Sequence, residues 1–264
     1  MDTDLMEQYR TWFSCFVQAH SSADERKQQN ILLKEEHTHQ VCDNARRIAA
    51  GLVLDVRAAA LAEVIALFHD VGRFPQYRTY GTFQDSCSVN HAALGARVLL
   101  EQNVLRDLPQ REQDLVVRAV TLHNVFTLPS GLDDDTLLFA QLVRDADKLD
   151  IWRVFMELLV LDRADWPSAA GLGLPDAPGY SPEVISSLLE RREMVRLTSL
   201  RSLNDFKLLQ LAWIYDLNFT PSLRMVHDRS IIERLAATMP QDPQVRRVVG
   251  DLRQYVDDRL AVPS

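Results

Sequence analysis

Helical periodicity runs through almost the whole of this 264-residue chain, and the alternation typical of strands is scarce. Apolar residues recur at three- and four-residue steps. They predict helices over residues 4–20, 27–53, 57–70, 91–103, 110–124, 136–162, 182–198, 202–217, 228–238 and 243–260. Only nine glycines occur, and several mark breaks between these segments. The sequence therefore predicts an all-α protein.

Two stretches lack this periodicity. Residues 72–90 are rich in aromatic and polar side chains, and residues 165–182 hold four prolines and three glycines. Loops of this length are often functional, and a lid is one role for the second. We expect three parts, namely an N-terminal helix with a core over 1–162, a Pro/Gly-rich loop over 163–182, and helices over 183–264 packed on the core as one compact unit.

The composition is that of a soluble globular protein, with 47% hydrophobic and 25% charged residues. The formal net charge of -8 disfavours binding to nucleic-acid polymers or acidic membranes, because both require a basic surface. The start, MDTDLMEQYR, does not resemble a signal peptide, and no apolar run is long enough to span a bilayer. Three cysteines without paired spacing are typical of reduced thiols. A cytoplasmic protein is expected, and its oligomeric state is left open.

Several of the seven histidines fall on apolar helix faces. The stripe Val41, Ala45, Ile48 and Leu52 reaches His37 when it is extended backwards by four residues. His39 lies about 200° round the same helix, on the polar face. Five further residues share faces with apolar neighbours or end an apolar helix: the pair His69 and Asp70, then His91, His123 and Asp147.

Six imidazole and carboxylate groups are thus predicted to point into one core. Any one of them alone would be interpreted as a hydrogen-bonded core residue. As a set they favour a divalent cation, because buried aspartates are rarely unpaired and the sequence shows no matching set of buried Lys or Arg. Imidazole with carboxylate suits Mn, Fe, Mg, Ni, Co or Zn and does not choose among them.

The same residues carry a family resemblance. His37, the adjacent His69 and Asp70, and Asp147 in RDADKLD resemble the H…HD…D signature of the HD-domain superfamily of metal-dependent phosphohydrolases. NHAALGARVLLE and TLHNVF resemble the additional histidine motifs of members that hold two metals. The resemblance covers roughly residues 30–162, and HDVGRFPQYRTYGTFQDSCSVNHAALG is similar to a bacterial subgroup of predicted HD hydrolases.

This resemblance implies an HD-domain helical bundle with additional C-terminal helices. It implies one metal ion held by His37, His69, Asp70 and Asp147, and a second held by Asp70, His91 and His123. His39 stands where relatives often have an apolar or basic residue, and we interpret it as a surface substitution.

The implied activity is hydrolysis of a phosphoester or phosphoanhydride bond in a small phosphorylated metabolite, with nucleotides foremost. Asp70 would accept a proton from the attacking water. Arg73 and Lys148 would contact phosphoryl oxygens, although each would equally suit a salt bridge at the rim. Gln76 and Tyr77, with Tyr80 and Phe83, would line the substrate pocket or only pack the loop onto the bundle.

Two other classes of function stay open. Some HD-fold proteins hold a di-iron centre and act as oxygenases with much the same ligands. A non-catalytic nucleotide or metal sensor is the third class, which the complete ligand set disfavours.

Overall fold

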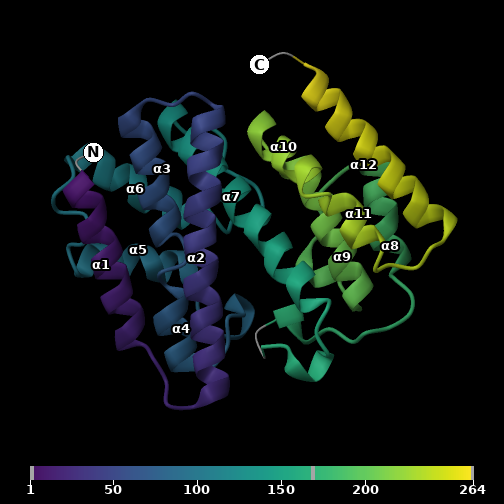
Figure 1. The fold of residues 1–264 in the computed structure, drawn as a ribbon, viewed down its shortest axis with the longest axis horizontal. Helices are drawn as coiled ribbons and strands as arrows, with labels where there is room; N and C mark the ends of the chain where they lie inside the picture. Colours follow the sequence, from purple (N-terminus) through teal and green to yellow (C-terminus); the bar gives the residue numbers. More distant parts are fainter. Residues whose placement is uncertain (1–2, 168–169, 263–264) are drawn as a thin grey trace. The chain divides into compact units, whose positions relative to one another are not determined.

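A computed structural model describes residues 3–167 and 170–262, and within them it contains helices and no strand (Figure 1). The prediction of an all-α fold is confirmed. The chain divides into two compact units. Unit 1 runs to Asp150 and also includes Pro167, whereas unit 2 begins at Ile151. The division therefore lies inside a helix, earlier than the loop at 163–182 where the sequence suggested a boundary.

Unit 1 is a bundle of helices. They are α1 (Thr3–Ala19), α2 (Glu25–Gly51), α3 (Val56–Phe68), α4 (Arg73–Tyr80), α5 (His91–Glu101), α6 (Gln110–Leu122) and the first part of α7 (Asp134–Leu158). Helices α2 and α3 lie side by side, and α3 also packs on α1 and α6 (Figure 1). An amide of Asn44 on α2 donates to the Ala146 carbonyl on α7 at 3.0 Å. These contacts bring α2, α3 and α7 together around one core.

Short polar side chains start the helices that matter for the site. Asp24, Asp55 and Asn90 each precede a helix in extended conformation and accept a hydrogen bond from a backbone N–H of its first turn. Such N-caps satisfy donors that have no partner inside the helix. The caps therefore fix where α2, α3 and α5 begin, and with them the helical positions of His37, His69 and His91.

Aromatic side chains fill the interior between α1, α3 and α4. Tyr9 and Trp12 on α1 meet Phe68 edge to face, with ring centroids 5.6 and 5.7 Å apart. Phe13 and Phe16 contact Phe74 in the same manner. Edge-to-face pairs of this kind stabilise a core beyond the area they bury. The core anchors the ends of α3 and α4, between which the His69–Asp70 pair lies.

Unit 2 is also helical. After the end of α7 it contains α8 (Pro182–Ser186), which continues as a π-helical turn (Ser187–Arg191), then α9 (Leu203–Ala212), α10 (Thr220–Asp228), α11 (Ile231–Ala236) and α12 (Pro243–Ala261). Helix α12 packs on α8, α10 and α11. The indole of Trp152 donates to the Gln210 carbonyl at 3.2 Å, which ties the end of α7 to α9.

The structure contains two helices that the sequence did not predict, and one predicted helix is shorter than expected. Helix α4 lies in the stretch 72–90 that showed no periodicity, and α10 lies almost entirely between the helices predicted over 202–217 and 228–238. The helix predicted over 182–198 ends early, because Arg192 adopts a left-handed conformation with φ of 53°. Residues with positive φ stop a helix, and here the chain turns away at that point.

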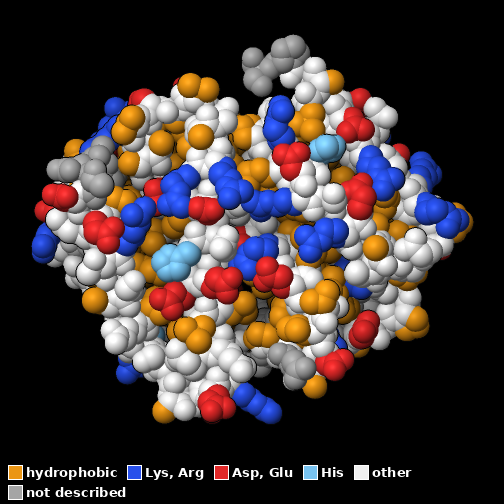
Figure 2. All heavy atoms as spheres, in the orientation of Figure 1, with side chains coloured by type: hydrophobic (Ala, Val, Ile, Leu, Met, Phe, Trp, Pro, Cys, Tyr) orange, Lys and Arg blue, Asp and Glu red, His pale blue; other side chains and the backbone are white. Residues whose placement is uncertain are grey.

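No described helix is both long and apolar enough to cross a membrane. On the face seen in Figure 2, Lys and Arg side chains lie next to Asp and Glu side chains. Charges of both signs are therefore interspersed on that face.

Candidate metal centre

The adjacent His69 and Asp70 follow directly after α3, in the turn that joins it to α4. Helix α3 is buried over most of its length, so the pair is carried into the interior, where His69 is fully buried and Asp70 is 3% exposed. The turn closes with the Val71 N–H donating to the Phe68 carbonyl and the Arg73 N–H donating to the Asp70 carbonyl. A charged group placed this deep requires partners of opposite charge.

Gly72 lets the first turn of α5 approach this pair. A Cβ built on Gly72 would lie 2.1 Å from the His91 carbonyl oxygen and 2.5 Å from the Gly95 nitrogen, both backbone atoms. Its φ of −68° is ordinary, so the requirement for glycine is one of space. The absent side chain therefore allows His91 to lie against the His69–Asp70 turn.

We expect Gly72→Ala to destabilise the protein by about 2 kcal/mol or more, because the new methyl group would overlap backbone that cannot move aside. Urea unfolding of the metal-free protein measures this. Gly250→Ala on α12 is the control, since nothing lies within 4 Å of its Cβ position. That change is expected to be neutral or to stabilise by about 1 kcal/mol. Equal stability of the Gly72 variant and wild type would contradict the close approach.

The two carboxylate oxygens of Asp70 face different histidines. Oδ2 lies 3.7 Å from His37 Nε2 and 3.6 Å from His69 Nε2. Oδ1 lies 3.2 Å from His91 Nε2 and 3.6 Å from His123 Nε2. Two groups of potential ligands therefore share Asp70, one with His37 and His69 and the other with His91 and His123.

Asp147 on α7 joins the first of these groups. Its Oδ1 lies 3.1 Å from His37 Nε2 and 3.8 Å from His69 Nε2. The structure thus brings together all six residues that the sequence nominated as metal ligands. They come from α2, the turn after α3, α5, the end of α6 and α7.

Each of the four histidines has an acceptor at Nδ1. His37 Nδ1 lies 2.6 Å from Asp150 and His91 Nδ1 lies 2.7 Å from Asp85, whereas His69 and His123 Nδ1 face backbone carbonyls at 2.7 Å. With these acceptors, we assign the proton of each neutral ring to Nδ1. The Nε2 lone pairs then point toward the Asp70 carboxylate from four directions.

These lone pairs have no donors within the described part of the chain. His37 Nε2 and His69 Nε2 are buried and make no hydrogen bond there. The Nε2 atoms of His91 and His123 lie 3.0 Å apart, an unfavourable contact for two lone pairs with no cation or proton to share. Buried polar atoms are normally satisfied. The arrangement of neutral imidazole nitrogens around carboxylates fits divalent cations, which would satisfy both kinds of group.

The charges of the site are consistent with this fit. Burial lowers the pKa of His69 to about 4 against the pull of Asp70 and Asp147, so its Nε2 is unprotonated near pH 7. Burial also acts to raise the pKa of Asp70, but Lys34, His69 and Arg73 outweigh it and hold the pKa well below its usual range. For His37, burial and Lys34 act to lower the pKa, but the nearby carboxylates of Asp147 and Asp150 outweigh them, and the pKa is raised. Carboxylates that attract a proton to His37 would also attract a metal cation.

Comparison with known families agrees with this geometry. The segment 35–152 matches the family model described as HD domain. Residues 35–152 are an HD domain. All six candidate ligands lie within it, and the family is one of metal-dependent phosphohydrolases. No curated protein and no solved structure matches the chain. Membership of a bacterial subgroup stays a prediction.

The structure adds residues to the site that the sequence did not suggest. Asp150 and Asp85 hold the Nδ1 atoms of His37 and His91. Lys34 Nζ lies 2.7 Å from Asp70 Oδ2. Lys34 precedes His37 by three residues and Asp150 follows Asp147 by three, so helical spacing could have placed both on the same faces as these ligands. Asp85 lies in the short 3-10 turn Asp85–Cys87 of the irregular loop, where spacing carries no such signal.

Lys and Arg side chains accompany the aspartates of the HD domain. The prediction that the buried aspartates have no matching set of buried Lys or Arg was therefore wrong. Lys34 pairs with Asp70, and both Arg144 and Lys148 on α7 are buried. Lys148 is 7% exposed, and its Nζ lies 3.5 Å from the Arg144 carbonyl. The balance of charge in the HD domain therefore rests on local Lys and Arg side chains as well as on any cation.

The other predicted substrate contacts are bonded within unit 1. Arg73 donates to Asp70 at 3.3 Å, to Asp85 at 3.0 Å and to the Phe83 carbonyl. Gln76 is fully buried, and its amide nitrogen lies 2.9 Å from Asp85, Ser88 and the Val89 carbonyl. The hydroxyl of the buried Tyr77 accepts from Asn30 at 2.9 Å. These contacts favour a positioning role for Gln76 and Tyr77. His39 is exposed, as expected.

Proposed function

We propose that this chain hydrolyses a phosphoester or phosphoanhydride bond of a small phosphorylated metabolite. The observation that carries the proposal is the pair of histidine groups that share the two oxygens of Asp70, with Nε2 atoms that have no donor among the described residues. His37, His69, Asp70 and Asp147 would hold one cation, and Asp70, His91 and His123 a second. When bound, such cations supply Lewis-acid activation of water and neutralise charge on phosphoryl oxygens.

Carboxylates of the protein would orient the histidines that hold the metal ions. The carboxylates of Asp85 and Asp150 fix the rings of His91 and His37 by accepting from Nδ1. Fixed rings hold the ligand atoms in place without reorganisation during turnover. Asp70, at the centre, would accept the proton of the attacking water.

Lys34 and Arg73 are the cations placed to meet the substrate. Both contact Asp70, and their side chains are 18% and 16% exposed, so neither is sealed in the core. If Asp70 held a cation, the ammonium of Lys34 would lose its contact with that carboxylate. Lys34 would then be free to donate to a phosphoryl oxygen. Lys148, which is buried and follows Asp147 in the sequence, is the further proposed contact.

Nucleotides are the substrate class we propose first. Phe83 is half-buried, and Lys34 Nζ lies 5.8 Å from its ring centroid. An aromatic surface beside phosphate-binding cations suits a ligand with a base and a phosphate.

The test is a screen of the purified full-length protein against nucleoside mono- and triphosphates, cyclic nucleotides and simple phosphate esters, each with Mn²⁺, Mg²⁺ or Fe²⁺. We expect release of phosphate or pyrophosphate that requires the metal and stops with EDTA. Oxygen consumption with an iron EPR signal would instead establish the di-iron oxygenase. Nucleotide binding with no turnover under any metal would favour a sensor.

A further inference from the structure

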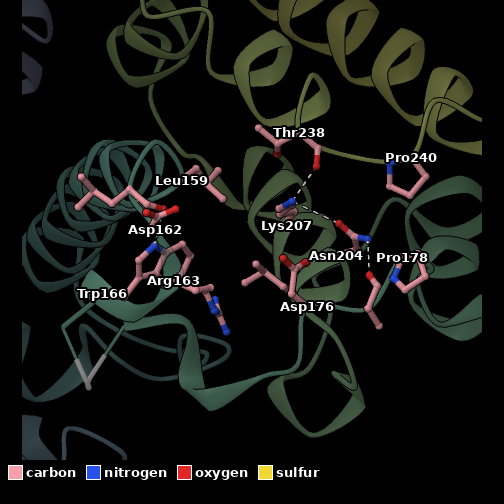
Figure 3. A pocket seen from close by; sticks show the side chains of 13 residues that line it. Leu159, Asp162, Arg163, Trp166, Asp176, Pro178, Asn204, Lys207, Thr238 and Pro240 are labelled. Atoms are coloured by element: carbon pink, nitrogen blue, oxygen red, sulfur yellow. Dashed lines mark hydrogen bonds between the residues drawn. The ribbon is translucent and has the colours of Figure 1, made fainter.

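Unit 2 contains a pocket of about 670 Å³ that the proposed hydrolysis does not use (Figure 3). Its walls come from the segment that follows α7, from α9 and from the turn after α11. The volume lies within the range of sites for small metabolites. In Figure 3, Arg163 and Trp166 lie on one side, and Lys207, Asn204 and Thr238 lie on the other.

Lys207 is the buried cation of this pocket. It is 5% exposed, and its Nζ donates to the Thr238 carbonyl at 2.7 Å and to Asn204 Oδ1 at 3.3 Å. Both acceptors are neutral, and no described carboxylate lies within 4 Å of Nζ. Asn204 is held in turn by the carbonyls of Ala177 and Gly179. A buried ammonium without a carboxylate is costly, so the position favours an incoming anion.

Arg163 provides a second cation. Its guanidinium carbon lies 4.3 Å from the centroid of the Trp166 ring, and Nη2 donates to the Leu174 carbonyl at 2.6 Å. No described carboxylate lies within 4 Å of this side chain either. Stacking on an indole fixes the plane of the guanidinium while leaving other N–H groups for a ligand.

Two carboxylates line the same pocket without a cation within 4 Å among the described residues. They belong to Asp162 and Asp176. Burial lowers the pKa of Lys207. The negative charge of Asp176 acts to raise this pKa and the positive charge of Arg163 acts to lower it, so both groups are close enough to influence Lys207. The pocket thus offers separated positive and negative groups, which a purely anionic or purely cationic ligand would satisfy only in part.

We propose that this pocket binds a small metabolite that carries one oxyanion group together with hydroxyl or ammonium donors. The oxyanion, a carboxylate or a phosphate, would lie between Lys207 and Arg163. The donors would face Asp162 and Asp176. Trp166 also lines the pocket and stacks on Arg163, so a ligand that binds Arg163 would lie close to the indole ring.

Fluorine NMR of the full-length protein labelled with 5-fluorotryptophan tests the proposal. Four tryptophans give four signals, and Trp166→Phe identifies the signal of Trp166. The probes are L-serine and glycerol 3-phosphate, which combine an oxyanion with donors, and inorganic phosphate and glycerol, which carry one feature each. We expect the Trp166 signal to shift with at least one combined probe, at a concentration at least about tenfold lower than with either single-feature probe. Comparison of serine with glycerol 3-phosphate distinguishes carboxylate from phosphate.

Variants then locate the ligand. Arg163→Met and Lys207→Met are expected to weaken binding at least about tenfold. Arg253→Met is the control and should not change binding, because Arg253 is exposed and pairs with Glu233 in another part of unit 2. Because Lys207 is buried, its replacement could also disturb folding. The variants of the exposed residues, Arg163→Met and Asp176→Asn, therefore decide the test. The proposal is overturned if no probe shifts the Trp166 signal, if single-feature probes bind as tightly as combined ones, or if the Arg163 and Asp176 variants bind like wild type.

Discussion

Replacing Asp70 by alanine is expected to remove bound metal and to lower turnover by about a thousandfold or more. The two oxygens of Asp70 face different histidine pairs, so one substitution removes a ligand from both groups. Metal assistance contributes several kcal/mol to transition-state stabilisation, and each 1.36 kcal/mol is a factor of ten in rate. Metal content by elemental analysis and phosphate release are measured on the same sample.

Asp43→Ala is the matched control. Asp43 is a carboxylate on the outer face of α2 that pairs with Arg46 and Arg47. Its loss removes the same charge without touching the site, so metal content and turnover should stay at wild-type values. Full metal content and full turnover in the Asp70 variant would show that the histidine groups are not the catalytic centre.

Replacing Asp85 or Asp150 by asparagine is expected to weaken metal binding at one group and spare the other. Asp85 accepts from His91 and Asp150 accepts from His37, so each carboxylate orients a ligand of a different group. Loss of such an orienting carboxylate typically costs about 10- to 100-fold in metal affinity. Mn²⁺ titrations followed by EPR of the free ion resolve tight and weak sites.

We therefore expect one weakened class of site in each single variant and two in the double variant. Asp135→Asn serves as the control, since Asp135 pairs with the exposed Arg111 away from the histidines. Thermal unfolding without metal separates orientation from loss of structure. Wild-type affinity at both sites in both variants would remove the orienting role.

The sequence predicted the fold well where helices have an apolar stripe, and failed where turn-forming residues lie inside a helix. The stretch that begins at Gly72 showed no periodicity, yet Gly72 adopts an ordinary helical conformation and Pro75 lies in the first turn of α4, where its missing N–H is not needed. Pro221 opens α10 in the same way. Such residues interrupt a pattern in sequence without interrupting the helix.

The site was predictable to the extent that its residues share helix faces. His37 and Asp147 were found because they extend apolar stripes, and His69 and Asp70 because they end a buried helix. Asp85 reaches His91 only through the path of the loop between α4 and α5, which no periodicity describes. The pairing of Lys34 with Asp70 depends on how α2 packs on α3, a tertiary contact between positions 36 residues apart.

The most direct test of the metal centre is a crystal structure of the protein grown with Mn²⁺, with anomalous scattering recorded at the manganese edge. We expect one peak among His37, His69, Asp70 and Asp147, and a second among Asp70, His91 and His123. A map with manganese only at other positions, and with hydrogen-bonded water in place of both peaks, would contradict the account.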